Sequence, residues 1–136
     1  MKRIVILFLT FSMVLLFIAC KKDAVGKYVG IYQGTLSSQE VVKENVEFCF
    51  EIDNSNEEML TMYGHSLKYR EENQYTADAA IVLEVIHILY PKTTRTQLAN
   101  SSALFVFEEK EVTMELTYSI AGNSEDQNMR FIGKKK

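Results

Sequence analysis

The sequence has few of the residues on which small catalytic or disulfide-bonded domains depend. Its 136 residues include two cysteines, two histidines, one proline, six glycines and no tryptophan. Two cysteines are too few for a disulfide scaffold or a multi-cysteine zinc site, and the low proline content excludes proline-rich and collagen-like classes. Motifs for a nucleophile elbow, a phosphate-binding loop, a zinc-protease helix or a Cys-x-x-Cys pair are also missing. We therefore expect a protein that is not an enzyme, with no cofactor and no metal.

Charge and hydropathy are balanced as in ordinary globular proteins. Fifteen Lys and Arg residues stand against 18 Asp and Glu residues, for a net charge of −3, and 47% of the residues are hydrophobic. The negative balance argues against a nucleic-acid partner, and the apolar fraction argues against wholesale disorder. The length predicts one domain rather than two.

The long hydrophobic run of the sequence lies at its start. Lys2 and Arg3 precede an apolar stretch from Ile4 to Ala19 that Thr10 and Ser12 alone interrupt. The stretch is short for a membrane-spanning helix and suits the core of a signal peptide. An uncleaved anchor helix is the alternative.

The run ends in Phe17-Ile18-Ala19-Cys20, which resembles the lipobox of bacterial lipoproteins, although Leu is usual where Phe17 stands. The resemblance implies that residues 1–19 are a signal peptide that is cut off and that Cys20 carries several acyl chains. Residues 20–25 would then be a lipidated tether to the membrane. Lys21 follows the cysteine, which by analogy with bacterial sorting rules points to the outer membrane of the cell envelope, in either leaflet.

Residues 26–136 show mostly a two-residue periodicity, which predicts strands. In 45–53 one face carries Val46, Phe48, Phe50 and Ile52, and in 112–120 the inward face carries Val112, Met114, Leu116, Tyr118 and Ile120. We expect further strands at 103–107 and 129–132, a polar turn at 108–111, and a hairpin of 59–63 with 67–70 around Gly64-His65. About eight antiparallel strands in one domain fit a small closed barrel or a curved sandwich.

Residues 79–90 are harder to assign, because they are apolar on both faces except at Glu84 and His87. A helix is possible, with Thr76 or Asp78 as its cap. Their high content of β-branched residues favours a strand covered on both sides, ended by Pro91 and followed by a polar loop at 93–102. The expected core comprises Tyr28, Phe48, Phe50, Ile81, Val85, Leu104, Val106, Met114, Leu116 and Tyr118.

Glycine and tyrosine alternate at the start of the domain, at Gly26, Tyr28, Gly30, Tyr32 and Gly34. Glycines at this spacing let a strand coil sharply, as a barrel requires. This strand and the last one resemble the calycin superfamily, in its small lipocalin-like lipoproteins of Gram-negative bacteria. Gly26-Lys27-Tyr28 stands where that family has a Gly-x-Trp motif, and Arg130 stands where it has a closing basic residue. The resemblance implies a lipocalin-like barrel in which Arg130 covers the aromatic ring of Tyr28.

An eight-stranded barrel either fills its interior with side chains or holds one small ligand. Because Phe48, Phe50, Met114 and Tyr118 would occupy most of that space, we expect function to lie in the loops at a barrel end. The leading candidate is the partner-binding loop Ala121, Gly122, Asn123 and Ser124, within 120–127. It resembles the loop of staphostatins, lipocalin-like inhibitors of papain-type cysteine proteases, in which a glycine fills the P1 site; Gly122 would be that residue.

Two kinds of partner are left open beside the membrane. One is a small apolar molecule or a surface glycan fragment, and the other is a secreted cysteine protease. A plain Gly-Asn turn is the simpler explanation of Gly122. Three other reactive residues have ordinary explanations: we expect His65 to be solvated, His87 to be a hydrogen-bonded core or pore-facing histidine, and Cys49, flanked by Glu47 and Glu51, to be an inert thiol.

Overall fold

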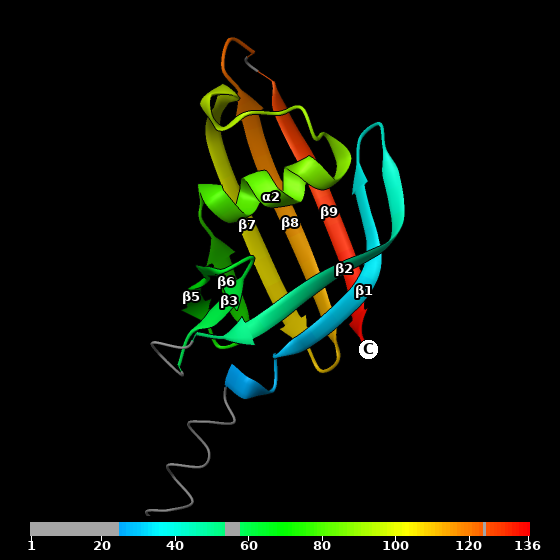
Figure 1. Ribbon diagram of the computed structural model, residues 1–136, viewed down its shortest axis with the longest axis vertical. Helices are drawn as coiled ribbons and strands as arrows, with labels where there is room; N and C mark the ends of the chain where they lie inside the picture. Colours follow the sequence, from blue (N-terminus) through cyan, green and yellow to red (C-terminus); the bar gives the residue numbers. More distant parts are fainter. Residues whose placement is uncertain (1–24, 54–57, 124) are drawn as a thin grey trace, which may run out of the picture.

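The computed structural model describes residues 25–53, 58–123 and 125–136 (Figure 1). The predicted signal peptide, Cys20 and Ser124 lie outside the described residues. Within the described part, no helix is long and apolar enough to cross a membrane. The elements are β1 (Gly30–Ser38), β2 (Val42–Ile52), β3 (Leu60–Met62), β4 (His65–Ser66), β5 (Lys68–Glu71), β6 (Gln74–Ala77), α2 (Ala79–Leu89), the 3₁₀ turn η1 (Arg95–Gln97), β7 (Leu98–Glu108), β8 (Glu111–Ile120) and β9 (Asp126–Lys135).

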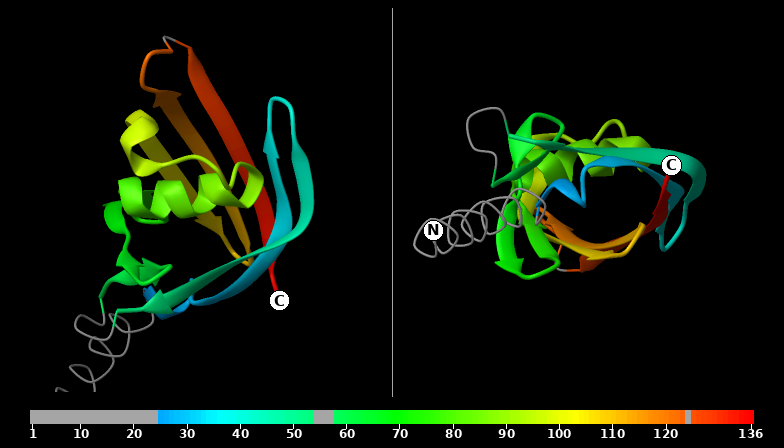
Figure 2. Two further views of the ribbon diagram at one scale, coloured as in Figure 1. Left: turned by 45° about the horizontal axis from the view of Figure 1, so that its top comes forward. Right: turned by 90° about the horizontal axis from the view of Figure 1, so that it is seen from below.

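The nine strands form one antiparallel sheet in the order β4-β3-β2-β1-β9-β8-β7-β6-β5. The sheet curls until its two edge strands, β4 and β5, are separated by Leu67 alone, and the view along the barrel shows the nearly closed ring (Figure 2). Leu67 is buried, and its N–H donates to the carbonyl of Leu60 at 2.8 Å. The expected all-β barrel is therefore confirmed, with nine strands instead of about eight.

Two glycines allow the sharp coil where β1 crosses β9. Gly34 lies opposite Gly133 in the register of these strands. A Cβ on Gly34 would sit 1.8 Å from the carbonyl oxygen of Ile132, and a Cβ on Gly133 would sit 2.5 Å from the ring of Phe131. On the other side of β1, the register with β2 shifts between Gly34 and Leu36, near Asn45 with a φ of 59°. Glycine and a bulge thus provide the curvature that closes a barrel.

Aromatic side chains fill the interior of the barrel. Tyr32 and Phe107 pack edge to face with ring centroids 5.7 Å apart, and Phe48 lies 4.0 Å from Phe131. Six aromatic side chains have essentially no solvent exposure, namely Tyr32, Phe48, Phe50, Phe105, Phe107 and Phe131. Of the four side chains expected there, Phe48, Phe50 and Met114 have no solvent exposure and Tyr118 is also buried.

The segment 79–90 forms a helix, so the prediction of a strand there was wrong. The side chain of Asp78 accepts a hydrogen bond from the N–H of Ile81 and caps helix α2. Ile81, Val82, Val85 and Ile86 are buried, a spacing that places them on one face of a helix. Burial of that face against the barrel outweighs the weak preference of β-branched residues for strands.

The predicted bounds of two strands, a loop and a hairpin need smaller corrections. The first strand begins at Gly30, and Tyr28 lies in a turn before it. The predicted polar loop 93–102 contains η1 and the first half of β7. The last strand is longer than predicted and runs over 126–135. The hairpin around Gly64 joins β3 to β4, with Met62 opposite His65, and β5 pairs with β6 instead.

The inward face of β7 is the opposite of the one predicted. Ala103, Phe105 and Phe107 are buried, whereas Leu104 and Val106 are half-buried on the outer face. All these residues are apolar, so the two faces of the strand do not differ enough in hydropathy to reveal its register. On β2, by contrast, Val46, Phe48 and Phe50 are buried as predicted, and Ile52 is exposed at the end of the strand.

The barrel has a closed and an open end. At the closed end, the lower one in Figure 1, lie the turn at 25–29, the β7–β8 turn and the end of β9. At the open end lie the β1–β2 turn, the connection 90–97 after α2 and the β8–β9 loop.

Candidate functional site

The three connections at the open end are tied to one another and to the barrel. The hydroxyl groups of Ser38 and Tyr90 lie 2.7 Å apart, which joins the end of β1 to the end of α2. The N–H of Ala121 donates to the carbonyl of Gln97 at 2.6 Å and joins the β8–β9 loop to η1. The open end is thus a braced rim.

Tyr118 lies near Tyr90 and Glu40 at this end of the barrel. Burial raises the pKa of Tyr118, and the nearby Tyr90 and Glu40 raise it further. These three residues come from β8, from the end of α2 and from the β1–β2 turn. The Tyr118 hydroxyl is therefore neutral at physiological pH.

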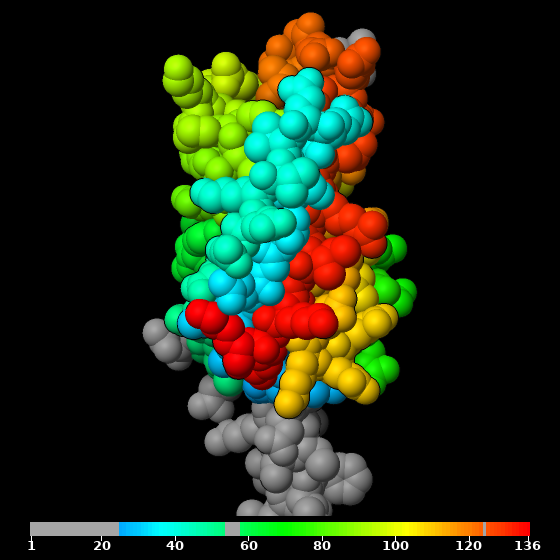
Figure 3. Space-filling view, turned by 90° about the vertical axis from the view of Figure 1, so that its right-hand side faces the viewer, coloured from blue at the N-terminus to red at the C-terminus, as the bar shows by residue number. Residues whose placement is uncertain are grey.

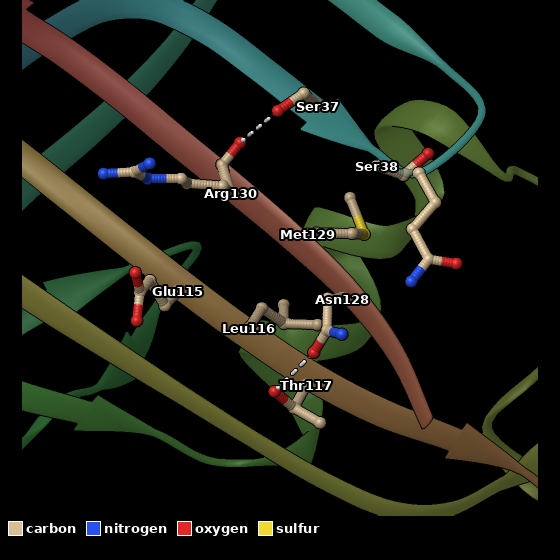
Figure 4. Close-up of a pocket in the computed structure, with 9 residues that line it drawn as sticks. Ser37, Ser38, Glu115, Leu116, Thr117, Asn128, Met129 and Arg130 are labelled. Carbon is tan, nitrogen blue, oxygen red and sulfur yellow. Dashed lines mark hydrogen bonds between the residues drawn. The ribbon is translucent and has the colours of Figure 1, made fainter. Parts of the chain in front are cut away.

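A groove of about 390 Å³ runs over the outer surface of β1, β9 and β8 near this end (Figure 4). Its volume lies in the range of small-molecule sites. The buried residues Leu116 and Met129 belong to its lining. Seven polar residues complete the lining: Ser37, Ser38, Gln39, Glu115, Thr117, Asn128 and Arg130.

Strand register explains why the polar residues gather here. Arg130 lies opposite Ser37 on one side and Glu115 on the other, and Asn128 lies opposite Thr117. The Ser37 hydroxyl donates to the carbonyl of Arg130 at 3.5 Å, and the Thr117 hydroxyl donates to the side-chain oxygen of Asn128 at 3.0 Å. In Figure 4, Arg130 and Glu115 extend at one end of the groove, with Thr117 and Asn128 toward the other. The arrangement offers hydrogen-bond donors and acceptors on a rigid sheet.

The predicted partner-binding loop lies at the same end. Ala121, Gly122 and Asn123 are exposed, and Gly122 has a φ of 88° with no atom within 4 Å of the position of a Cβ. The N–H of Asn123 donates to the carbonyl of Ile120 at 3.0 Å, which closes a turn around Gly122. A residue at positive φ in such a turn is the setting that favours glycine. The turn alone therefore accounts for Gly122.

Arg130, the basic residue that the calycin resemblance pairs with Tyr28, does not lie at the closed end. Arg130 lies in the groove just described, well along β9 from the closed end. At the closed end, the amine of Lys135 donates to the carbonyl of Lys27 at 3.2 Å, and the amine of Lys27 lies 5.1 Å from the centre of the Tyr28 ring. The basic side chains near Tyr28 at the closed end are therefore those of Lys27 and Lys135, and not that of Arg130.

Cys49, His65 and His87 are the other reactive residues considered in the sequence. Cys49 is exposed on β2; partial burial raises the pKa of its thiol, and Glu51, whose carboxylate lies 3.7 Å from the sulfur, raises it further. His65 is exposed in β4, and the Nε2 atom of His87 donates to the carbonyl of Thr93. Across residues 25–53, 58–123 and 125–136, no three His, Cys, Asp or Glu side chains are grouped to hold a metal ion.

Comparison of the chain with protein-family models, with characterised proteins and with solved structures gives no match. The calycin and staphostatin resemblances therefore stay predictions from short motifs. The outer groove was missed from the sequence, because Ser37, Thr117 and Asn128 lie on three strands and none belongs to a recognisable motif. The polar alternation of β8 and β9 was the one signal, and it indicates an exposed face without saying which residues meet.

Proposed function

We propose that this protein is a lipid-anchored binding module of the cell envelope, without catalytic activity, that binds a glycan at the open end of its barrel. The observation that carries the ligand class is the groove lined by hydroxyl, amide and charged side chains from three strands. Sugars are recognised by such groups on a rigid surface, because each hydroxyl both donates and accepts hydrogen bonds.

The anchor is inferred from the sequence, and the fold supports its geometry. Cys20 precedes the first described residue, Val25, by five residues. The turn at 25–29, which is blue in Figure 1, lies at the closed end of the barrel. A lipid on Cys20 would therefore hold the closed end at the membrane and leave the open end facing away from it.

The filled interior argues for the outer groove over an interior site. Phe48, Phe50 and Phe105 have no solvent exposure and pack with centroid distances of 5.6–6.4 Å. A small apolar ligand would have to displace such side chains, at a cost typical of core rearrangement.

The test is binding of the purified full-length protein to an array of bacterial surface oligosaccharides. Arg130→Met keeps the apolar stem and removes the guanidinium from the groove, whereas Arg70→Met is a matched change on exposed β5. Loss of one charged hydrogen bond costs about 1.5–3 kcal/mol, so we expect Arg130→Met to weaken glycan binding roughly 10-fold or more. Arg70→Met should bind like the wild type. An array without any bound glycan contradicts the ligand class, and equal binding by Arg130→Met contradicts the site.

Inhibition of a papain-type cysteine protease is the alternative function. Its support is the exposed Gly122 with positive φ at the tip of the β8–β9 loop, on the end that would face away from the membrane. Gly122→Ala should then weaken inhibition or make the loop a substrate while the barrel stays folded. Residual activity of secreted papain-type proteases from the same cell, with the wild type and with Gly122→Ala, tests this. If micromolar wild-type protein leaves every such protease fully active, the inhibitor function is wrong.

A further inference from the structure

The closed end of the barrel carries a second, larger groove that the proposed binding function does not use. It has a volume of about 960 Å³, with Tyr28 and Phe107 among its lining residues. The charged residues around these two aromatic side chains are four lysines and one glutamate: Lys27, Lys110, Lys135, Lys136 and Glu109. The lining therefore has an excess of positive charge in a protein whose net charge is −3.

The lysines are brought together from three distant parts of the chain. The backbone N–H of Lys135 donates to the carbonyl of Lys110 at 2.7 Å, and its amine donates to the carbonyl of Lys27 at 3.2 Å. Lys136 extends the same strand end, and its amine forms an ion pair with Glu47 at 2.6 Å. In the space-filling view, residues of the end of β9 (red) and of the β7–β8 turn (yellow) lie together at the lower end (Figure 3).

Most of the acidic residues at this end line an adjoining groove. It shares Lys27, Tyr28, Phe107 and Glu109 with the first groove and adds Glu72, Glu108 and Glu111. The first groove thus has four lysines against one glutamate, and the adjoining groove has four glutamates against one lysine. Such a polarised end is attracted to a negatively charged plane in one orientation and repelled in the other.

The position of Cys20 in the sequence indicates which charged surface the closed end of the barrel can contact. Four residues, 21–24, separate Cys20 from Val25, and the five residue steps between them span no more than about 18 Å in an extended chain. Two of them, Lys21 and Lys22, add positive charge beside the cysteine, against one Asp23. A lipid on Cys20 would therefore hold the closed end within a short distance of the bilayer surface.

We propose that the lysine-rimmed groove docks on anionic phospholipid headgroups of the bilayer that holds Cys20; this rests on the lipid anchor of the proposed function. Lysines close to an anionic bilayer are attracted to it over about one Debye length, roughly 10 Å in dilute salt. Docking through this groove turns Glu72, Glu108 and Glu111 of the adjoining groove away from the bilayer. It fixes the barrel upright, with the outer groove and the β8–β9 loop directed away from the membrane.

The experiment uses the acylated full-length protein in phosphatidylcholine vesicles with and without phosphatidylglycerol. Lysine acetylation rates are measured residue by residue by mass spectrometry. We expect Lys27 and Lys110 to be acetylated about threefold more slowly, or slower still, on the anionic vesicles, and high salt to abolish the difference. Lys43 and Lys92, exposed residues on β2 and after α2, should react equally on both. Equal rates for all four lysines on both vesicles contradict the proposal.

Two double variants test whether the charge of the groove lysines, and not only the nearness of the bilayer, causes the protection from acetylation. Lys27→Glu with Lys110→Glu should abolish the protection of Lys135, whereas Lys43→Glu with Lys92→Glu should leave it intact. Protection that survives the first pair contradicts docking through the groove, and protection by lipopolysaccharide alone contradicts phospholipid as the bound surface. Failure of the anchor itself is distinguished beforehand, because a protein without lipid lacks the acyl mass and does not float with either vesicle.

Discussion

At the scale of single residues, the barrel depends on positions where no side chain fits. Gly34 shows this most clearly, since its Cβ would collide with the backbone oxygen of Ile132, which a flexible side chain cannot relieve. We expect Gly34→Ala to lower the free energy of unfolding by about 3 kcal/mol or more. Chemical denaturation measures the free energy of unfolding of this variant. Gly26→Ala is the control, because no atom lies within 4 Å of the position of a Cβ on Gly26. Equal stability of the two variants would show that β1 and β9 do not approach as described.

The thiol of Cys49 gives a pH-dependent test of the outer face of β2. Its pKa is raised by partial burial and then by Glu51, and a raised pKa means less reactive thiolate at any pH below it. Alkylation by iodoacetamide should therefore be slow at pH 7 and rise only above the range usual for cysteine. Glu51→Gln should move the rate profile to lower pH. Glu47→Gln should move it less, since Glu47 is paired with Lys136. Fast alkylation of the wild type at pH 7 would contradict these surroundings.

At the scale of elements, α2 shows how tertiary burial decides between helix and strand. The Asp78 cap was readable in the sequence, yet β-branched content favoured a strand, and only packing of the helix on the barrel resolves the choice. Asp78→Ala should destabilise the protein by about 1 kcal/mol, because the N–H of Ile81 loses its acceptor. Thermal unfolding followed by circular dichroism measures the loss. Glu84→Ala, on the same helix away from the cap, should change stability little, and an equal effect of both would argue against the cap.

Strand β7 shows the limit of periodicity, because its two faces are both apolar. Phe105→Ala should cost about 3–5 kcal/mol, as expected for a fully buried aromatic residue, and Leu104→Ala should cost clearly less, since Leu104 is half-buried. Denaturant unfolding of the two variants decides the register. A larger loss for Leu104→Ala would restore the face predicted from the sequence. On β2, where Val46, Phe48 and Phe50 alternate with more polar residues, the sequence identified the inward face.

At the scale of the whole molecule, the sequence predicts the class of fold better than the site. Alternating strands and glycines indicated the barrel, and Gly34 with Gly133 shows where it coils. The outer groove depends on which strands become neighbours, and β1 lies beside β9 although some 90 residues separate Ser37 from Arg130. Local patterns carry no information on such pairing, so Arg130 was assigned to the closed end when it belongs to the groove.

Both proposals for the whole molecule depend on one covalent modification, the lipid on Cys20. Expression of the protein in a bacterial host grown with a palmitate analogue, followed by measurement of the intact mass of the purified protein, tests it directly. We predict a mature wild-type chain that begins at Cys20 and carries acyl groups, and a Cys20→Ala variant that stays unlabelled at precursor mass. Normal processing and label in the variant, or an unlabelled mature wild type, would contradict the anchored orientation of the barrel.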